Sequence, residues 1–218
     1  MGSCFRIALP SKGRLKAPAL KILEEVGLKV EEKERTYILK TSSSDFEVVL
    51  ARAFDIPLYV QYGAATLGIT GHDIILEREA DVYEVSDLRF GKCKLVLAVP
   101  IEANLNKAIE LSSNAKVATE FPNLTRKFFN SLKKPVEIIT VRGSAELTPK
   151  LGLADAIVDL STTGETLRKN GLKEIEVILE STARLICNKV AYRSFSKVKE
   201  FIERVDEAVK KNEAFNQA

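Results

Sequence analysis

The chain has 218 residues, 45% hydrophobic and 29% charged, with a formal net charge of +3, so it is long enough for two lobes and too weakly charged for a nucleic-acid groove. No segment approaches the roughly 20 apolar residues that span a bilayer, the N-terminus lacks a signal-peptide pattern, and three scattered cysteines indicate neither disulfides nor a zinc site. We therefore expect a cytoplasmic globular protein without a membrane or nucleic-acid partner.

The first hundred residues alternate apolar runs with helical periodicity, which is typical of an α/β protein. Gly27 ends the first helix. The pattern predicts strands over residues 5–9, 37–40, 46–51, 67–70, 82–85 and 94–99, and helices over residues 15–26, 56–62 and 73–78.

A second alternating series begins near Lys116. It predicts strands over residues 116–119, 136–141 and 156–160, and helices over residues 124–132, 146–151 and 166–169. Strands 176–179 and 184–187 then return the chain to the first lobe, where helix 196–211 closes it with Val198, Phe201, Ile202, Val205 and Val209 on one face. We expect residues 1–92 plus 185–218 to form lobe I, residues 93–184 to form lobe II, and a ligand cleft to lie between the lobes.

The most informative segment joins the predicted strand 156–160 to the following helix. It contains a run of hydroxyl side chains and one glycine: Ser161, Thr162, Thr163, Gly164, Glu165 and Thr166. Hydroxyls and free N–H groups where a strand passes into a helix favour an anion. Asp155 and Asp159 would repel a phosphate, so they are better suited to accept hydrogen bonds from ribose hydroxyls. An ordinary helix cap would also use such residues, but the density of hydroxyls favours a sugar phosphate.

Further polar groups follow other predicted strands. Lys12 and Arg14 flank a glycine after the first strand and could neutralise a polyphosphate, although a solvated loop is equally compatible. Arg52 ends a strand and is expected to point toward a ligand. Asp73 either caps a helix or reaches a ligand. His72 is the only histidine, and no triad partner can be assigned to it.

In the second lobe, Gly143 and Ser144 could add N–H donors after the strand 136–141. Glu146 has three open roles: it could cap its own helix, bind a hydroxyl, or hold a metal-bound water. No segment of the sequence shows the ligand spacing of a dedicated metal site.

Six phrases, in order, resemble the catalytic part of the ATP phosphoribosyltransferase family, the first enzyme of histidine biosynthesis. They are Ile7-Ala8-Leu9-Pro10-Ser11-Lys12-Gly13-Arg14-Leu15, Gly68-Ile69-Thr70-Gly71-His72-Asp73, Leu88-Arg89-Phe90-Gly91-Lys92-Cys93-Lys94-Leu95, Val117-Ala118-Thr119-Glu120-Phe121-Pro122-Asn123-Leu124, Gly143-Ser144-Ala145-Glu146, and the stretch from Asp155 to Leu167.

The resemblance implies an α/β, two-lobed, periplasmic-binding-protein-like (type II) fold with hinges near Pro100 and Arg184. It implies that ATP and 5-phosphoribosyl 1-pyrophosphate react to give N1-(5-phosphoribosyl)-ATP and pyrophosphate, with Mg²⁺ bound alongside the substrates. The implied roles are phosphoribosyl pyrophosphate binding by Asp155, Asp159 and Ser161 to Thr166, catalysis by Lys12 and Arg14, and nucleotide binding by Arg52, Asp73, Gly143, Ser144 and Glu146.

The length resembles that of the short form of the family, which implies a homodimer that works with a regulatory subunit related to histidyl-tRNA synthetase. A truncated long form would look identical. Two rival functions are also compatible with the sequence: a cytosolic solute-binding protein that shares the fold but carries out no chemistry, and a phosphoribosyltransferase that acts on another base.

Overall fold

The computed structural model describes residues 4–31 and 36–216. The chain divides into two compact units, residues 1–91 with 182–218 (unit 1) and residues 92–181 (unit 2). The boundaries expected from the sequence, after residues 92 and 184, fall close to these. Pro100, expected near a hinge, lies inside unit 2 at the end of a strand.

Unit 1 is built on a six-stranded sheet with the order β2-β3-β1-β4-β11-β5. Its strands are β1 (Phe5–Pro10), β2 (Ile38–Lys40), β3 (Phe46–Ala51), β4 (Leu67–Gly71), β5 (Tyr83–Asp87) and β11 (Ala183–Cys187). The central strand β1 runs parallel to both β3 and β4. The carboxyl ends of these three strands therefore lie at one edge of the sheet.

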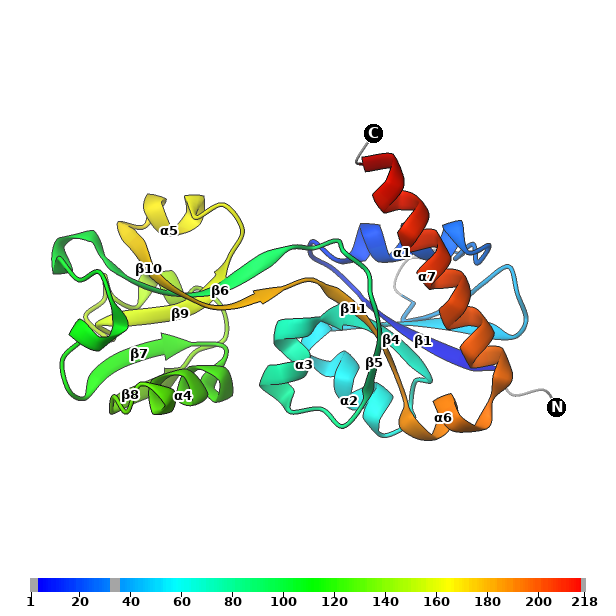
Figure 1. Cartoon of the computed structure of the whole chain (residues 1–218), viewed down its shortest axis with the longest axis horizontal. Coiled ribbons are helices and arrows are strands. Elements are labelled where there is room, and N and C mark those ends of the chain that lie inside the picture. Colours follow the sequence, from blue (N-terminus) through cyan, green and yellow to red (C-terminus); the bar gives the residue numbers. More distant parts are fainter. Residues whose placement is uncertain (1–3, 32–35, 217–218) are drawn as a thin grey trace. The chain divides into compact units, whose positions relative to one another are not determined.

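Both faces of this sheet are covered by helices, as Figure 1 shows. Alternate residues of β1, such as Ile7 and Leu9, pack in one core with α1 (Lys16–Glu25) and α7 (Ser196–Asn216). Ala8 points the other way, into a core with α2 (Ile56–Gln61) and α3 (His72–Arg78). Burial on both faces explains why β1 reads as an almost continuous apolar run.

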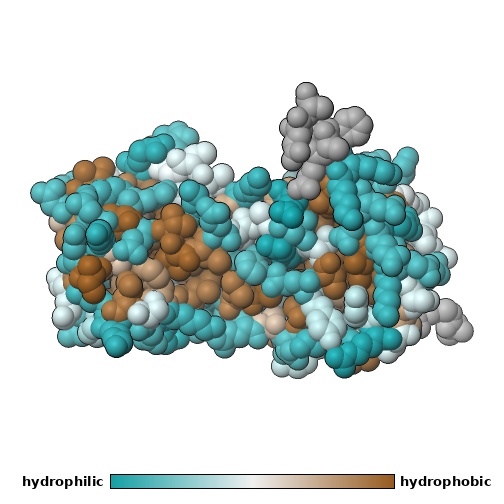
Figure 2. Space-filling view, in the orientation of Figure 1, coloured by the Kyte–Doolittle hydropathy of each residue, from teal (hydrophilic) through white to brown (hydrophobic). Residues whose placement is uncertain are grey.

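The C-terminal helix α7 packs as its sequence predicts. Its five apolar residues Val198, Phe201, Ile202, Val205 and Val209 are all buried, and hydrophilic side chains dominate the visible outer surface over this helix in Figure 2. None of the helices in the described part of the chain combines the length and apolarity needed to cross a membrane.

Unit 2 contains a five-stranded sheet with the order β10-β6-β9-β7-β8. Its elements are β6 (Cys93–Pro100), β7 (Ala115–Thr119), β8 (Val136–Thr140), β9 (Ala156–Ser161), β10 (Leu172–Ser181), α4 (Pro122–Ser131) and α5 (Glu165–Lys169). Strand β7 is parallel to β8 and β9, whereas β6 is antiparallel to β9 and β10. The carboxyl ends of β7, β8 and β9 share one edge, and the first residues of β6 meet them there.

Two local predictions differ from the structure. The helix predicted over 146–151 is a short 3-10 helix, Ala145–Leu147, because Pro149 has no N–H to continue an α-helical ladder and the Thr148 hydroxyl instead donates to the Ala145 carbonyl at 2.7 Å. A helix that was not predicted, α6 (Lys189–Ser194), begins where the Asn188 side chain accepts hydrogen bonds from the backbone N–H groups of Val190 and Ala191.

Candidate active site

The hydroxyl-rich loop of unit 2 connects β9 to α5, as the sequence predicts. Gly164 adopts a left-handed conformation with φ of +72°, which a residue with a Cβ reaches only at a cost. Thr162 and Thr163 are exposed, and the Thr163 hydroxyl accepts a hydrogen bond from the Glu165 N–H at 3.4 Å. Glu165 itself pairs with Lys169 at 2.7 Å, so its carboxylate serves α5.

A cavity of about 380 Å³ lies beside this loop, where the loop, α5 and β10 meet. Three cationic side chains line it: Lys94 from β6, Arg168 from α5 and Lys173 from β10. Ser161, Thr162, Thr163 and Gly164 form the loop side of the cavity. Hydroxyl groups and three cations around one cavity are suited to a phosphate group.

One carboxylate also reaches this cavity. Oε1 of Glu174 lies 2.5 Å from Oγ of the buried Ser161, and a Cβ placed on Gly164 would lie 2.9 Å from the same oxygen. Sequence reasoning missed Lys94, Arg168, Lys173 and Glu174. Arg168 alone had a local signal, since it follows the loop by one helical turn, whereas the others come from neighbouring strands.

Asp159 lies near the carboxyl end of β9 and is largely buried. Burial raises the pKa of its carboxyl group to about 6, and the nearby charges of Glu146 and Glu120 contribute to this rise. A hydrogen bond of 2.7 Å from the Leu160 N–H to the Asp159 carboxylate lowers the pKa in part. A carboxylate held at such a pKa is common at functional sites.

The structure does not bring Asp155 to the loop. Asp155 precedes β9, and Asp159 follows it by four residues, roughly 13 Å along an extended strand. The carboxylate of Asp155 accepts the Lys116 N–H at 2.8 Å, and its own N–H donates to the Lys116 carbonyl at 2.8 Å. Asp155 therefore joins the amino ends of β7 and β9, and its expected contact with the sugar has no support in this geometry.

The segment after β8 lies at the same edge as the loop, because β8 is parallel to β7. Gly143 and Ser144 both adopt left-handed conformations, with φ of +88° and +53°, and both are exposed. Glu146 is half-buried in the 3-10 helix and close enough to Asp159 to raise its pKa. Glu146 and Asp159 therefore belong to one acidic region.

In unit 1, three predicted cations gather at the carboxyl edge of the sheet. Lys12 and Arg14 follow β1 and are exposed, with Gly13 between them at φ of +85°. Arg52 follows β3 and is exposed as well. The Ser11 N–H donates to the Ala51 carbonyl at 2.7 Å, which ties the two strand ends together. This edge therefore presents positive charge to solvent.

Asp73 is placed differently from its prediction as a ligand contact. Its side chain is fully buried, and a Cβ on Gly71 would collide with its Oδ1, so the carboxylate packs against the turn between β4 and α3. A supporting role in this turn fits better than contact with a nucleotide. The neighbouring His72 has its Nδ1 2.8 Å from Oε2 of Glu84, and Nε of Arg184 lies 3.7 Å from the same oxygen.

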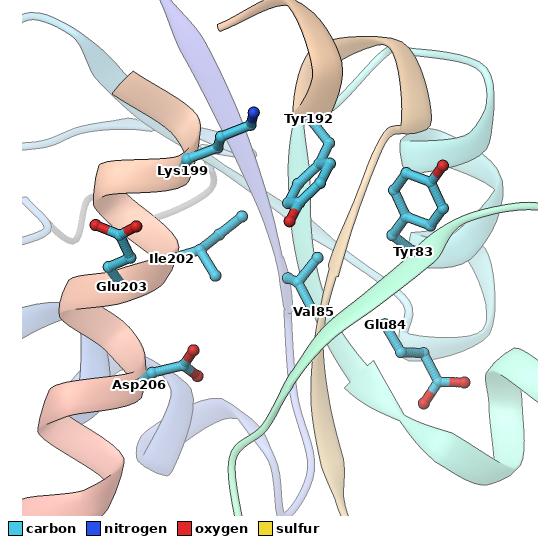
Figure 3. Close-up of a pocket in the computed structure, with 8 residues that line it drawn as sticks. All are labelled: Tyr83, Glu84, Val85, Tyr192, Lys199, Ile202, Glu203 and Asp206. Carbon is cyan, nitrogen blue, oxygen red and sulfur yellow. The ribbon is translucent and has the colours of Figure 1, made fainter. Parts of the chain in front are cut away.

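A larger cavity, of about 500 Å³, lies in unit 1 between α7, α6 and β5. Figure 3 shows Ile202 and Asp206 directed from α7 toward the strand that carries Val85. The rings of Tyr83 and Tyr192 pack edge to face, with centroids 5.3 Å apart. This cavity contains none of the predicted site residues, so its greater size does not make it the better candidate for catalysis.

Fold and site together define a protein with the type II periplasmic-binding-protein fold and a phosphate-suited loop in its second unit. A crystal structure of an ArgBP mutant from T. maritima matches with a TM-score of 0.64 over 99% of this chain and 91% of that chain. At 13% identity this likeness concerns the fold alone. The two-lobed α/β fold predicted from the sequence is confirmed.

The family follows from closer relatives. The family model HisG, ATP phosphoribosyltransferase, matches residues 52–207. ATP phosphoribosyltransferases from Methanosarcina acetivorans and Methanopyrus kandleri are 47% and 50% identical over 95% and 84% of this chain, which spans 73% and 64% of their own lengths. The ATP phosphoribosyl transferase (HisG:HisZ) complex from Thermotoga maritima matches with a TM-score of 0.84 and 30% identity, over 95% of this chain and 99% of that chain.

The chain belongs to the ATP phosphoribosyltransferase family. The predicted activity, transfer of a phosphoribosyl group to ATP in the first step of histidine biosynthesis, is confirmed at the level of the family.

Proposed function

We propose that unit 2 binds the 5′-phosphate of phosphoribosyl pyrophosphate at the loop Ser161 to Thr166. The observation that carries this proposal is the cavity beside the loop, which combines the loop hydroxyls with Lys94, Arg168 and Lys173. A phosphate dianion that enters there exchanges water for several charge-assisted hydrogen bonds. The left-handed Gly164 lets the backbone approach that anion closely.

Asp159 is the residue that we assign to the ribose hydroxyls. Hydrogen bonds from hydroxyl groups favour the ionised form of a carboxyl group whose pKa burial has raised. Glu146, in the same acidic region, is assigned to the acceptor nucleotide together with Gly143 and Ser144. Asp155 is not part of this proposal, because it lies at the opposite end of β9.

For the chemical step we propose that Lys12 and Arg14 act on the leaving group. Adenine N1 attacks C1 of the ribose, and the bond between C1 and the pyrophosphate oxygen breaks with its electron pair on pyrophosphate. Cations that meet this growing charge stabilise the transition state more than the ground state. Arg52, at the same edge of unit 1, is assigned to the nucleotide, and Asp73 supports the turn beside it.

Mg²⁺ fits this site as part of the substrate complex. Among the described residues, no group of three or more His, Cys, Asp or Glu side chains could hold a metal ion. Magnesium usually binds through one or two carboxylates plus substrate phosphates, and Asp159 or Glu146 could provide such a carboxylate. Bound there, the ion would neutralise part of the pyrophosphate charge.

We also propose a protein partner. The T. maritima relative, of which this chain covers 99%, is a HisG:HisZ complex, which supports a second, regulatory kind of subunit. From the resemblance to the short form we further propose that this subunit is related to histidyl-tRNA synthetase and that this chain forms a homodimer. A cytoplasmic location fits a biosynthetic reaction that consumes ATP. Native mass measurement with and without the candidate subunit tests the assembly.

The catalytic proposal is tested by mixing the protein with ATP, phosphoribosyl pyrophosphate and Mg²⁺ and following the ultraviolet absorbance of phosphoribosyl-ATP, with the regulatory subunit added in parallel. Lys94→Ala should raise KM for phosphoribosyl pyrophosphate about tenfold and leave KM for ATP near its original value. Lys116→Ala removes the same charge at the opposite edge of the sheet and serves as the control. Equal KM values for all three proteins would exclude the cavity as the phosphate site.

A further inference from the structure

The phosphate-suited cavity already contains an acidic oxygen. Oε1 of Glu174 lies 2.5 Å from Oγ of Ser161 and would lie 2.9 Å from a Cβ on Gly164. Lys94, Arg168 and Lys173 line the same cavity. The carboxylate therefore sits among the groups that we assign to the phosphate of the substrate.

This carboxylate and a bound phosphate exclude each other for two reasons. A serine hydroxyl has one proton to donate, so Ser161 donates either to Glu174 or to a phosphate oxygen. Two anions a few ångströms apart also repel each other, and the repulsion is stronger in a partly buried cavity than in water. Entry of a phosphate therefore requires the Glu174 side chain to leave.

Departure of Glu174 does not require a change in the fold. Glu174 belongs to β10, which is held to β6 through its backbone, with Glu174 opposite Ala98. The residue is exposed as a whole, and its flexible side chain can turn toward solvent while the strands stay paired. The exchange of one anion for another is then a side-chain rotation.

We propose that Glu174 is an internal competitor for the phosphate site, which acts through Ser161 and occupies the cavity until a sugar phosphate displaces it. The inference rests on the proposed function of this cavity. Inorganic phosphate makes few contacts beyond the cavity, so this competition weakens its binding. A ribosyl phosphate meets the same competition, but its sugar and pyrophosphate contacts outweigh the loss, so the larger substrate still displaces the carboxylate.

The test is calorimetric binding of ribose 5-phosphate and of inorganic phosphate to the full chain. Glu174→Gln keeps the size of the side chain and its acceptor oxygen but removes the charge, and it should bind both ligands about fivefold more tightly, the scale of one exposed charge interaction. Glu174→Ala should shift affinity in the same direction. Glu137→Gln removes the same charge from β8, at the far edge of the sheet, and should bind as the original protein does.

Equal or weaker binding by both Glu174 variants would overturn the competitor, because a carboxylate that merely supported Ser161 would lower affinity when neutralised. Lys94→Ala and Gly164→Ala separate this inference from the proposed function. If they lose affinity while Glu174→Gln gains none, the phosphate site stands and only the competitor fails. If they bind ribose 5-phosphate as the original protein does, the phosphate does not bind here and both proposals fail.

Discussion

Replacement of Gly164 by alanine probes the loop at its most constrained position. An alanine at φ of +72° costs about 1 to 2 kcal/mol. The new Cβ would also lie 2.9 Å from Oε1 of Glu174 and 3.3 Å from a terminal nitrogen of Arg168. Since both atoms end flexible side chains, they can move, and the collision adds little to the loss of stability. It does, however, place a methyl group in the proposed phosphate site.

Gly171→Ala is a matched control for this change. Gly171 has φ of +74° in the same unit, and a Cβ there would meet no atom within 4 Å. Both variants should therefore lower the melting temperature by a few degrees, but only Gly164→Ala should weaken binding of phosphoribosyl pyrophosphate, by about tenfold or more. Thermal unfolding and calorimetry measure the two effects. Equal affinity in both variants would refute the placement of the phosphate at Gly164.

Three further predictions concern charged residues. Lys12→Ala and Arg14→Ala should each lower kcat about a hundredfold with little effect on stability; unchanged turnover in steady-state kinetics removes them from the site. The pKa of Asp159 is raised from 3.8 to about 6 in the folded protein. Burial of its carboxyl group therefore does not lower the free energy of unfolding below pH 3.8, and it lowers that free energy by the full amount above pH 6. Asp159→Asn should therefore stabilise the protein by about 1 to 2 kcal/mol at pH 8, after allowance for residual exposure, but should not stabilise it at pH 3.5. Melting curves at both pH values check the sign of this effect. The same substitution should raise KM for phosphoribosyl pyrophosphate. Asp155→Ala removes the hydrogen bond to Lys116 and should lower the free energy of unfolding by up to about 1 kcal/mol. Its KM for phosphoribosyl pyrophosphate should not change, and a raised KM would show that Asp155 does contact the sugar.

The sequence predicted the elements that depend on local chemistry. Apolar runs located β1 and β9, the spacing of apolar residues located α7, and the hydroxyl-rich loop with its glycine was expected between β9 and α5. Where local chemistry was misjudged, the miss has a local cause: Pro149 shortened one predicted helix, and the capping side chain of Asn188 began a helix that apolar spacing did not indicate.

The sequence by itself determined the α/β fold, the family and the position of the anion loop, because backbone conformation, periodicity and turn chemistry are properties of neighbouring residues. Only the tertiary structure decided which side chains surround that loop. Strand pairing and helix packing bring Lys94, Lys173 and Glu174 to Ser161, and no short-range pattern records which strands become neighbours. The same pairing ties Asp155 to Lys116 at the start of β7 and buries Asp73 in its turn, since neighbouring strands and depth in the core are set by the whole sheet.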